Sequence, residues 1–246
     1  MSQDKPSALY KFLYKIVGLV YRPFTVVGRE NLPAESCVIV GNHSQLHGPL
    51  GMEFYAARPR FTWCNHEMMS FKEAPNYTFT DFWSKKPASV RWLFKIVSYL
   101  IAPLCVLLFN NAKTIPVYHD NRLLETFRQS VKRLEEGNDV VIFPECYTPH
   151  NNIVYDFQKG FAETALFYRR KTGRDLSFVP MYLCPARREI HYGKPVTFDS
   201  SKPPKEETEA VRVYLMDAIT AMAVALPRHR VVPYPNKPKK EYPYNK

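Results

Sequence analysis

The stretch Cys37-Val-Ile-Val-Gly-Asn-His43 is an apolar run with an abrupt polar end. Its first four residues are apolar and three of them are β-branched, which predicts a buried strand over 37–40. Gly41, Asn42 and His43 then begin a polar loop. Open α/β sheets bind their ligands where such strands end. This loop is therefore the first candidate site.

Strand-like and helix-like patterns alternate on both sides of this stretch. We expect further strands over 24–27, 114–118, 139–145, 178–183 and 190–196. We expect helices over 8–22, 161–170 and 206–226, and one that runs from Asn121 to a stop at Gly137. Such alternation predicts an α/β fold, with a mixed, mostly parallel sheet flanked by helices.

The chain divides into three segments on these patterns. Residues 1–23 form an amphipathic helix, residues 24–226 form the α/β domain, and residues 227–246 are a basic tail rich in Pro, Lys and Tyr. The tail is expected to lack regular structure.

The positive charge is concentrated at the two ends of the chain. The 246 residues include 34 Lys and Arg against 23 Asp and Glu, hence a net charge of +11. Residues 1–30 hold five cations and two anions (+3), and residues 227–246 hold six and one (+5). A broadly basic domain that binds nucleic acid is therefore not expected. Cationic ends favour contact with an anionic surface.

The five cysteines are odd in number, lie far apart and form no C-x-x-C pair. Neither a disulfide framework nor a structural zinc site is expected, and a reducing compartment is the simpler interpretation. The N-terminus is not a typical secretory signal, because Lys11, Lys15 and Arg22 interrupt its apolar stretch.

Two apolar segments raise the question of a membrane. Residues 8–22 place apolar side chains on one face and Lys11 and Lys15 on the other, which suits a helix lying in a membrane interface or a terminal helix packed on its own domain. The uncharged apolar run 96–109 has 14 residues and contains Pro103. A spanning helix needs about 20. A buried helix and a segment that dips into the membrane both remain open for this run.

His43 and Glu145 are the candidate chemical groups. An imidazole at a sheet edge can take a proton from an alcohol near neutral pH, although a lone loop histidine is often structural. Glu145 follows an apolar run at the end of another expected strand, where it can orient a base, bind a hydroxyl or simply be solvated.

Other reaction classes find less support. His43 and His47 have the spacing of metal ligands on a helix, but Ser44 stands where the zinc hydrolases need glutamate. We expect no metal site, and a metal-dependent lipid hydrolase is the third alternative. The sequence contains neither a G-x-S-x-G elbow nor a G-x4-G-K-[ST] loop, which disfavours the corresponding serine hydrolases and P-loop nucleotidases.

Seven segments between residues 24 and 226 follow one another in a familiar order. They are Val27-Gly-Arg-Glu-Asn-Leu-Pro33 with Cys37-Val-Ile-Val-Gly-Asn-His43, Cys64-Asn-His-Glu-Met68, Ile115-Pro-Val-Tyr-His119, Val141-Ile-Phe-Pro-Glu145, Phe157-Gln-Lys-Gly-Phe161, Val179-Pro-Met-Tyr182 and Ile190-His-Tyr-Gly-Lys-Pro-Val196. In this order they resemble the glycerolipid acyltransferase superfamily, whose best-known members acylate lysophosphatidic acid.

The resemblance implies a function and a site. A fatty acyl group would pass from acyl-CoA or acyl carrier protein to the hydroxyl of a lysophospholipid or related lipid, with no cofactor besides that co-substrate. His43 would be the general base and Glu145 the second catalytic residue, while Asn42, His119 and Arg122 would bind substrate. The expected partners are membrane lipid and the acyl thioester donor. The expected location is the cytoplasmic face of a membrane, as a peripheral or monotopic protein.

The sequence departs from the family pattern at three places. Gly48 stands where an aspartate usually orients the histidine, His119 replaces an arginine, and Cys146-Tyr147-Thr148 replaces Gly-Thr-Arg. Glu67, Asp81 and Glu145 are the candidates to supply the missing carboxylate. The alternative function is therefore a catalytically impaired relative that binds lipid or acyl donor at the membrane.

Overall fold

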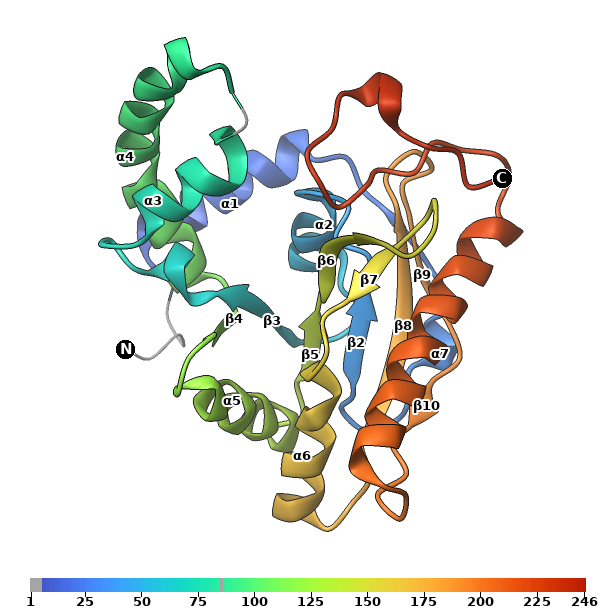
Figure 1. Cartoon of the computed structure of the whole chain (residues 1–246). Coiled ribbons are helices and arrows are strands. Elements are labelled where there is room, and N and C mark those ends of the chain that lie inside the picture. The colour runs from blue at the N-terminus through green and yellow to red at the C-terminus, as the bar shows by residue number, and fades with distance from the viewer. Residues whose placement is uncertain (1–5, 85) are drawn as a thin grey trace. The chain divides into compact units, whose positions relative to one another are not determined.

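The computed structural model describes residues 6–84 and 86–246, and the chain divides into two compact units (Figure 1). Unit 1 comprises residues 1–22 and 62–126, and unit 2 comprises residues 23–61 and 127–246. Residues 1–5 of the expected N-terminal segment lie outside the described residues.

Unit 2 is built on a mixed, mostly parallel sheet with the strand order β1-β9-β8-β2-β5, and β10 pairs with β8. These strands are β1 (Thr25–Val27), β2 (Val38–Gly41), β5 (Asp139–Ile142), β8 (Ser177–Cys184), β9 (Glu189–Tyr192) and β10 (Val196–Thr197). Strand β2 lies parallel to both neighbours, with Ile39 opposite Val141 on one side and Val179 on the other. All four residues of β2 are buried, as the sequence predicts for this strand, and the mixed sheet confirms the expected fold class.

Helices flank this sheet. They are α2 (His47–Tyr55), α6 (Thr164–Thr172), α7 (Pro204–Ala225) and the larger part of α5 (Leu123–Glu135), with 3-10 turns at Arg29–Asn31, Phe161–Glu163 and Lys239–Glu241. Helix α7 contacts β8 and buries an apolar stripe that includes Val211, Leu215 and Ile219. The 3.6-residue spacing of that stripe is why the sequence predicts this helix.

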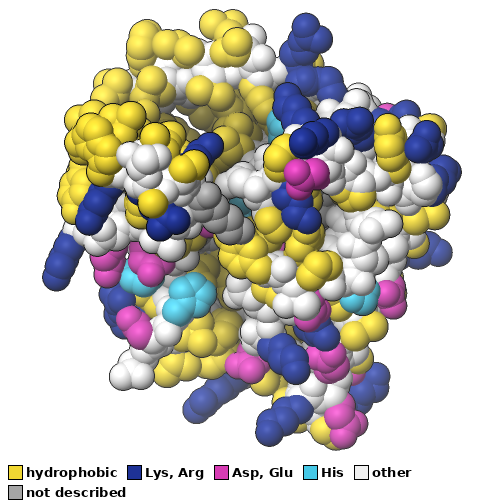
Figure 2. Space-filling model, turned by 45° about the horizontal axis from the view of Figure 1, so that its top comes forward, with side chains coloured by type: hydrophobic (Ala, Val, Ile, Leu, Met, Phe, Trp, Pro, Cys, Tyr) yellow, Lys and Arg dark blue, Asp and Glu magenta, His cyan; other side chains and the backbone are white. Residues whose placement is uncertain are grey.

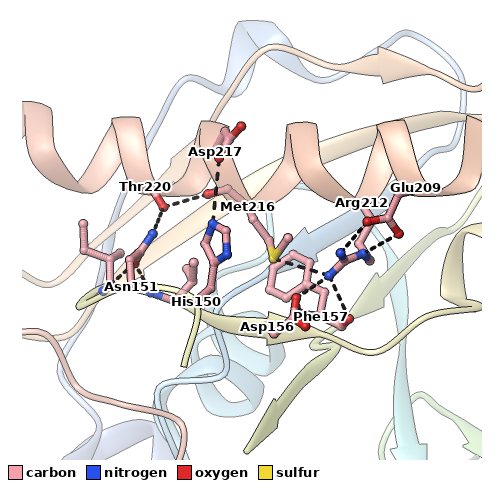
Figure 3. Close-up of polar contacts among 11 residues, drawn as sticks. His150, Asn151, Asp156, Phe157, Glu209, Arg212, Met216, Asp217 and Thr220 are labelled. Atoms are coloured by element: carbon pink, nitrogen blue, oxygen red, sulfur yellow. Dashed lines mark hydrogen bonds and ion pairs between the residues drawn. The ribbon is translucent and has the colours of Figure 1, made fainter. Parts of the chain in front are cut away.

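A β-hairpin leaves the sheet after β5. Pro144 ends the run that the sequence predicts as one strand, and the chain continues into β6 (Glu145–Pro149) and β7 (Tyr155–Phe157), which pair antiparallel. Figure 3 shows this hairpin fastened to α7. Asn151 Nδ2 donates to Thr220 Oγ1 at 2.9 Å, and the Arg212 guanidinium binds both Glu209 and Asp156.

Unit 1 is mainly helical. It contains α1 (Ala8–Val20), a 3-10 turn at His66–Met69, α3 (Ala74–Thr78), a π-helical turn at Phe79–Trp83 and α4 (Ala88–Asn111). Strand β3 (Arg60–Asn65) begins at the unit boundary and lies parallel to β4 (Thr114–Val117). The backbone N–H of Ser7 donates to Asn111 Oδ1 at 2.7 Å, and so ties the start of α1 to the end of α4.

Helix α4 is longer than its uncharged core. The sequence pattern isolates 14 apolar residues, but residues 88–95 join the same helix and Pro103 lies within it. Its buried residues are Ser98, Ala102 and Val106. By length and composition, α4 is the one helix among the described residues that suffices to cross a membrane. Figure 2 shows hydrophobic side chains gathered over this part of unit 1.

Candidate functional site around His43

His43 follows the end of β2 in a sharp turn. Ser44 and Gln45 both take positive φ values, 46° and 56°, in the left-handed region that residues other than glycine rarely occupy. The N–H groups of His47 and Gly48 donate to the carbonyls of Ser44 and His43 at 3.1 and 3.0 Å. The turn thus closes on itself and α2 begins at His47. Such conformations are retained where the surrounding structure imposes them, often at functional sites.

The Glu145 carboxylate holds this turn in place. Its Oε2 accepts the backbone N–H of His43 at 2.6 Å, and its Oε1 accepts the N–H of Tyr155 at 2.9 Å. The side chain is 2% exposed, and burial raises the pKa of Glu145 to about 7, against the opposing effect of the two N–H groups. Glu145 therefore joins the His43 turn to the β6–β7 hairpin.

Asn42 braces the same turn from the other side. Its Oδ1 accepts the N–H of Leu183 at 2.8 Å, and its Nδ2 donates to the Leu183 carbonyl at 3.0 Å and to Ser44 Oγ at 2.7 Å. Its side chain is buried, and these contacts engage its donors and its oxygen within the protein. The structure places Asn42 as a link between the turn and β8.

The imidazole of His43 contacts two aromatic rings. The ring centroid of Phe143 is 5.4 Å away at an interplanar angle of 66°, and that of Tyr234 is 5.5 Å away at 70°. Both are edge-on arrangements. Tyr234 belongs to the C-terminal tail, and no sequence motif pointed to it.

Gly48 is packed against the backbone of His43. A Cβ at this position would lie 2.4 Å from the His43 carbonyl oxygen and 2.9 Å from a ring carbon of Phe143. The turn as formed therefore has no room for a side chain at the place where the family pattern carries aspartate.

His47 is the first residue of α2. Burial lowers the pKa of its imidazole, and the positive charges of Arg188 and Lys239 act in the same direction. These effects favour the neutral ring. Among the described residues, no group of three or more His, Cys, Asp or Glu side chains is placed to hold a metal ion.

The other two expected substrate-binding residues, His119 and Arg122, belong to unit 1, whereas His43 belongs to unit 2. His119 is exposed in the segment after β4. The Arg122 guanidinium binds Asp120, with Nη2 to Oδ2 at 2.7 Å and Nε to Oδ1 at 3.1 Å, and lies 4.3 Å from the ring centroid of Tyr118. This guanidinium holds the pKa of Asp120 at about 2, so Arg122 already carries an anionic partner.

Of the three candidate carboxylates, Glu145 belongs to the unit of His43, whereas Glu67 and Asp81 belong to unit 1. Glu145 contacts His43 through the backbone N–H of that residue. Sequence spacing could not have shown this, because the two residues are 102 positions apart.

Comparison with known proteins gives a distant structural likeness. No protein-family model matches the chain, and no curated protein matches it. A solved structure that is similar is the 1-acyl-sn-glycerophosphate (LPA) acyltransferase PlsC from Thermotoga maritima, with a TM-score of 0.48 and 15% sequence identity. The similarity covers 89% of this chain and 79% of that one.

Proposed function

We propose that the protein is an acyltransferase that works at a membrane surface. It moves a fatty acyl group from acyl-CoA or acyl carrier protein to the hydroxyl of a lysophospholipid or related lipid. The observation that carries the proposal is the 2.6 Å hydrogen bond between the Glu145 carboxylate and the backbone N–H of His43. It joins the Gly-Asn-His and Phe-Pro-Glu segments, the two parts of the sequence in which the family pattern places its chemistry.

The proposed chemistry requires one base and one positioned turn. The His43 imidazole takes the proton of the acceptor hydroxyl, and the oxygen attacks the thioester carbonyl carbon. The new C–O bond forms, the C–S bond breaks, and the thiolate receives the proton from the imidazolium. Glu145 serves this reaction by holding the turn that carries His43, and no metal ion is required.

Exposed apolar helices support a membrane location. In α1 the exposed side chains include Leu9, Phe12, Ile16, Leu19 and Val20. In α4 they include Trp92, Leu93, Ile96, Tyr99, Leu100 and Leu104. Large exposed apolar surfaces mark sites of protein or membrane contact. The proposed location is the cytoplasmic face of a membrane, where anionic lipids attract basic segments.

The assignment of His43 is tested by substitution. Labelled acyl-CoA and acyl carrier protein are offered to the wild-type protein with a panel of lysolipids, and products are read by mass spectrometry. His43→Ala is expected to lower turnover by at least about a hundredfold, because a positioned base contributes that much or more. His150→Ala, at the hairpin tip beside Asp217, is the matched control and is expected to keep its activity. A folded His43→Ala protein with the turnover of wild type would refute the assignment.

A second candidate function is favoured by Gly48. The His43 carbonyl occupies the space of the usual aspartate, which suits a relative that binds lipid or acyl donor without reacting. In that case native mass spectrometry detects an acyl thioester bound to the wild-type protein, while no acceptor in the panel is acylated. Chelator-sensitive lipid hydrolysis would instead identify the metal-dependent alternative.

A further inference from the structure

We propose that the C-terminal loop, residues 229–245, forms a wall of the His43 site and that its Tyr234 is a positioning residue for the His43 imidazole. The catalytic part of this proposal rests on the proposed acyl transfer. The placement of the ring does not, and it is tested separately.

The two ends of the loop lie side by side and form its neck, which is anchored to the core of unit 2 by hydrogen bonds. His229 and Asn245, at its two ends, are 6% and 5% exposed. Asn245 Oδ1 accepts the N–H of His229 at 2.9 Å, and Asn245 Nδ2 donates to the Ala223 carbonyl of α7 at 2.7 Å. His229 Nε2 lies 2.8 Å from the hydroxyl of Tyr182 in β8. Buried polar side chains with satisfied partners fix a segment in one arrangement.

Backbone pairing closes the neck between these two anchors. Arg230 and Tyr244 form an antiparallel bridge, and the N–H of Val231 donates to the Pro243 carbonyl at 2.9 Å. The guanidinium of Arg228 lies 3.9 Å from the ring centroid of Tyr244. Although the segment contains little regular structure, it is a closed loop with a defined base (Figure 1).

The middle of the loop, here called its tip, contacts the turn that carries His43. Gln45 Nε2 lies 3.4 Å from the Pro235 carbonyl and 3.1 Å from the Tyr242 hydroxyl. The ring of Tyr234 lies 5.2 Å from that of Tyr147 in the β6–β7 hairpin. The tip thus contacts both structures that Glu145 joins.

These contacts give Tyr234 a specific task. The position that usually carries an orienting carboxylate is Gly48, which has no side chain and no space for one. The imidazole lies in edge-on contact with two aromatic rings, those of Phe143 and Tyr234. Packing against two rings restricts rotation of the imidazole, and restricted rotation favours a reactive geometry.

The placement is tested by NMR without reference to turnover. The Cε1–Hε1 signal of His43 is assigned by its loss in His43→Ala. Tyr234→Ala is expected to change the chemical shift of this signal, because an adjacent aromatic ring is removed, while Tyr234→Phe keeps it near the wild-type position. Asn245→Ala releases the neck and is expected to shift it in the same direction as Tyr234→Ala. Tyr214→Ala on α7, where the hydroxyl donates to the Lys194 carbonyl, is the control and leaves the signal in place.

The positioning role is tested by kinetics on the same variants. Tyr234→Ala is expected to lower kcat by about tenfold with KM within about twofold, the size of one aromatic contact, and Tyr234→Phe restores kcat. An unchanged His43 signal in folded Tyr234→Ala and Asn245→Ala overturns the placement. A changed signal with an unchanged kcat overturns the positioning role. A wild-type protein without turnover refutes the proposed function, and the NMR result then still decides whether Tyr234 holds the imidazole.

Discussion

At the scale of single residues, the buried Glu145 carboxyl connects separate segments of the chain. The sequence marks it as a carboxylate at a strand end, but its partners are backbone N–H groups of two other segments, at His43 and Tyr155. No spacing rule predicts such contacts, because they depend on how the turn and the hairpin fold back. Burial raises the pKa of this carboxyl to about 7 from its ordinary 4.5.

This pKa predicts how stability depends on pH. Between pH 4.5 and 7 the folded protein retains a proton that the unfolded chain has lost, so the contribution of Glu145 to stability falls as pH rises through this window. The total loss is about 3 kcal/mol, from 1.36 kcal/mol for each pKa unit. Glu145→Gln has no carboxyl to titrate at this position. The free energy of unfolding of wild type minus that of the variant is therefore expected to fall by about 3 kcal/mol between pH 4.5 and pH 8.

Urea unfolding across that pH range measures the difference. The contributions of all other titratable groups are common to both proteins and largely cancel in it. Glu135→Gln, at an exposed position near the end of α5, is the control and is expected to leave the pH dependence as it is. If the free energy of unfolding of wild type and of Glu145→Gln changed with pH in parallel, a raised pKa at Glu145 would be contradicted.

At the scale of elements, the start of α2 depends on Gly48. Gly48→Ala is expected to lower the free energy of unfolding by about 1–3 kcal/mol, because the new methyl group meets the His43 backbone and cannot be relieved by a rotamer change. Gly51→Ala in the same helix is the matched control. Its Cβ meets the end of the flexible Leu183 side chain, and alanine favours the helix, so a small change is expected.

Thermal and urea unfolding of the two variants give the comparison. Gly48→Asp is expected to be at least as destabilised as Gly48→Ala, because its side chain is larger. A Gly48→Ala protein as stable as wild type would show that the turn relaxes easily, and that the absence of aspartate has another cause.

Sequence periodicity predicts some elements well and misses others for physical reasons. Strand β2 and helix α7 are found because each buries a regular apolar pattern. Helix α2 was missed because Gly48, Pro49 and Gly51 weaken its helical propensity, and packing provides the stability instead. A regular pattern of apolar residues predicts a helix only where the helix buries one apolar face. Helix α2 has no clear face of this kind.

The C-terminal loop and the hairpin carry no periodic signal either. Their positions are set by single polar contacts such as those of His229, Asn245 and Asn151, each with a partner far away in the sequence. The sequence therefore predicted a site around His43 and Glu145 but not Tyr234, which completes its surroundings.

At the scale of the whole molecule, apolar surface and positive charge are two separate features that would attach the protein to a membrane under the proposed function. The chain carries +11, of which +8 lies in residues 1–30 and 227–246. Part of the C-terminal charge is engaged within the protein, since Arg228 and Arg230 lie over the ring of Tyr244 and Lys237 lies over that of Tyr155. On α4, by contrast, the apolar side chains of Trp92, Tyr99 and Leu100 are exposed.

We therefore expect α4 to contribute more to membrane binding than the terminal cations do. Leu100, 73% exposed on α4, is changed to glutamate, and Val213→Glu on α7, where the valine is 39% exposed, serves as the control. Leu100→Glu is expected to lower the partition coefficient on lipid vesicles by at least about tenfold, since a buried Leu contributes about 2 kcal/mol and a charge opposes insertion. Flotation with neutral and anionic vesicles at low and high salt measures both contributions.

Raising the salt screens the attraction of the basic residues and is expected to weaken binding to anionic vesicles by less than Leu100→Glu does. Equal binding of Leu100→Glu and wild type would mean that α4 does not enter the membrane, and a complete loss of wild-type binding at high salt would assign attachment to charge.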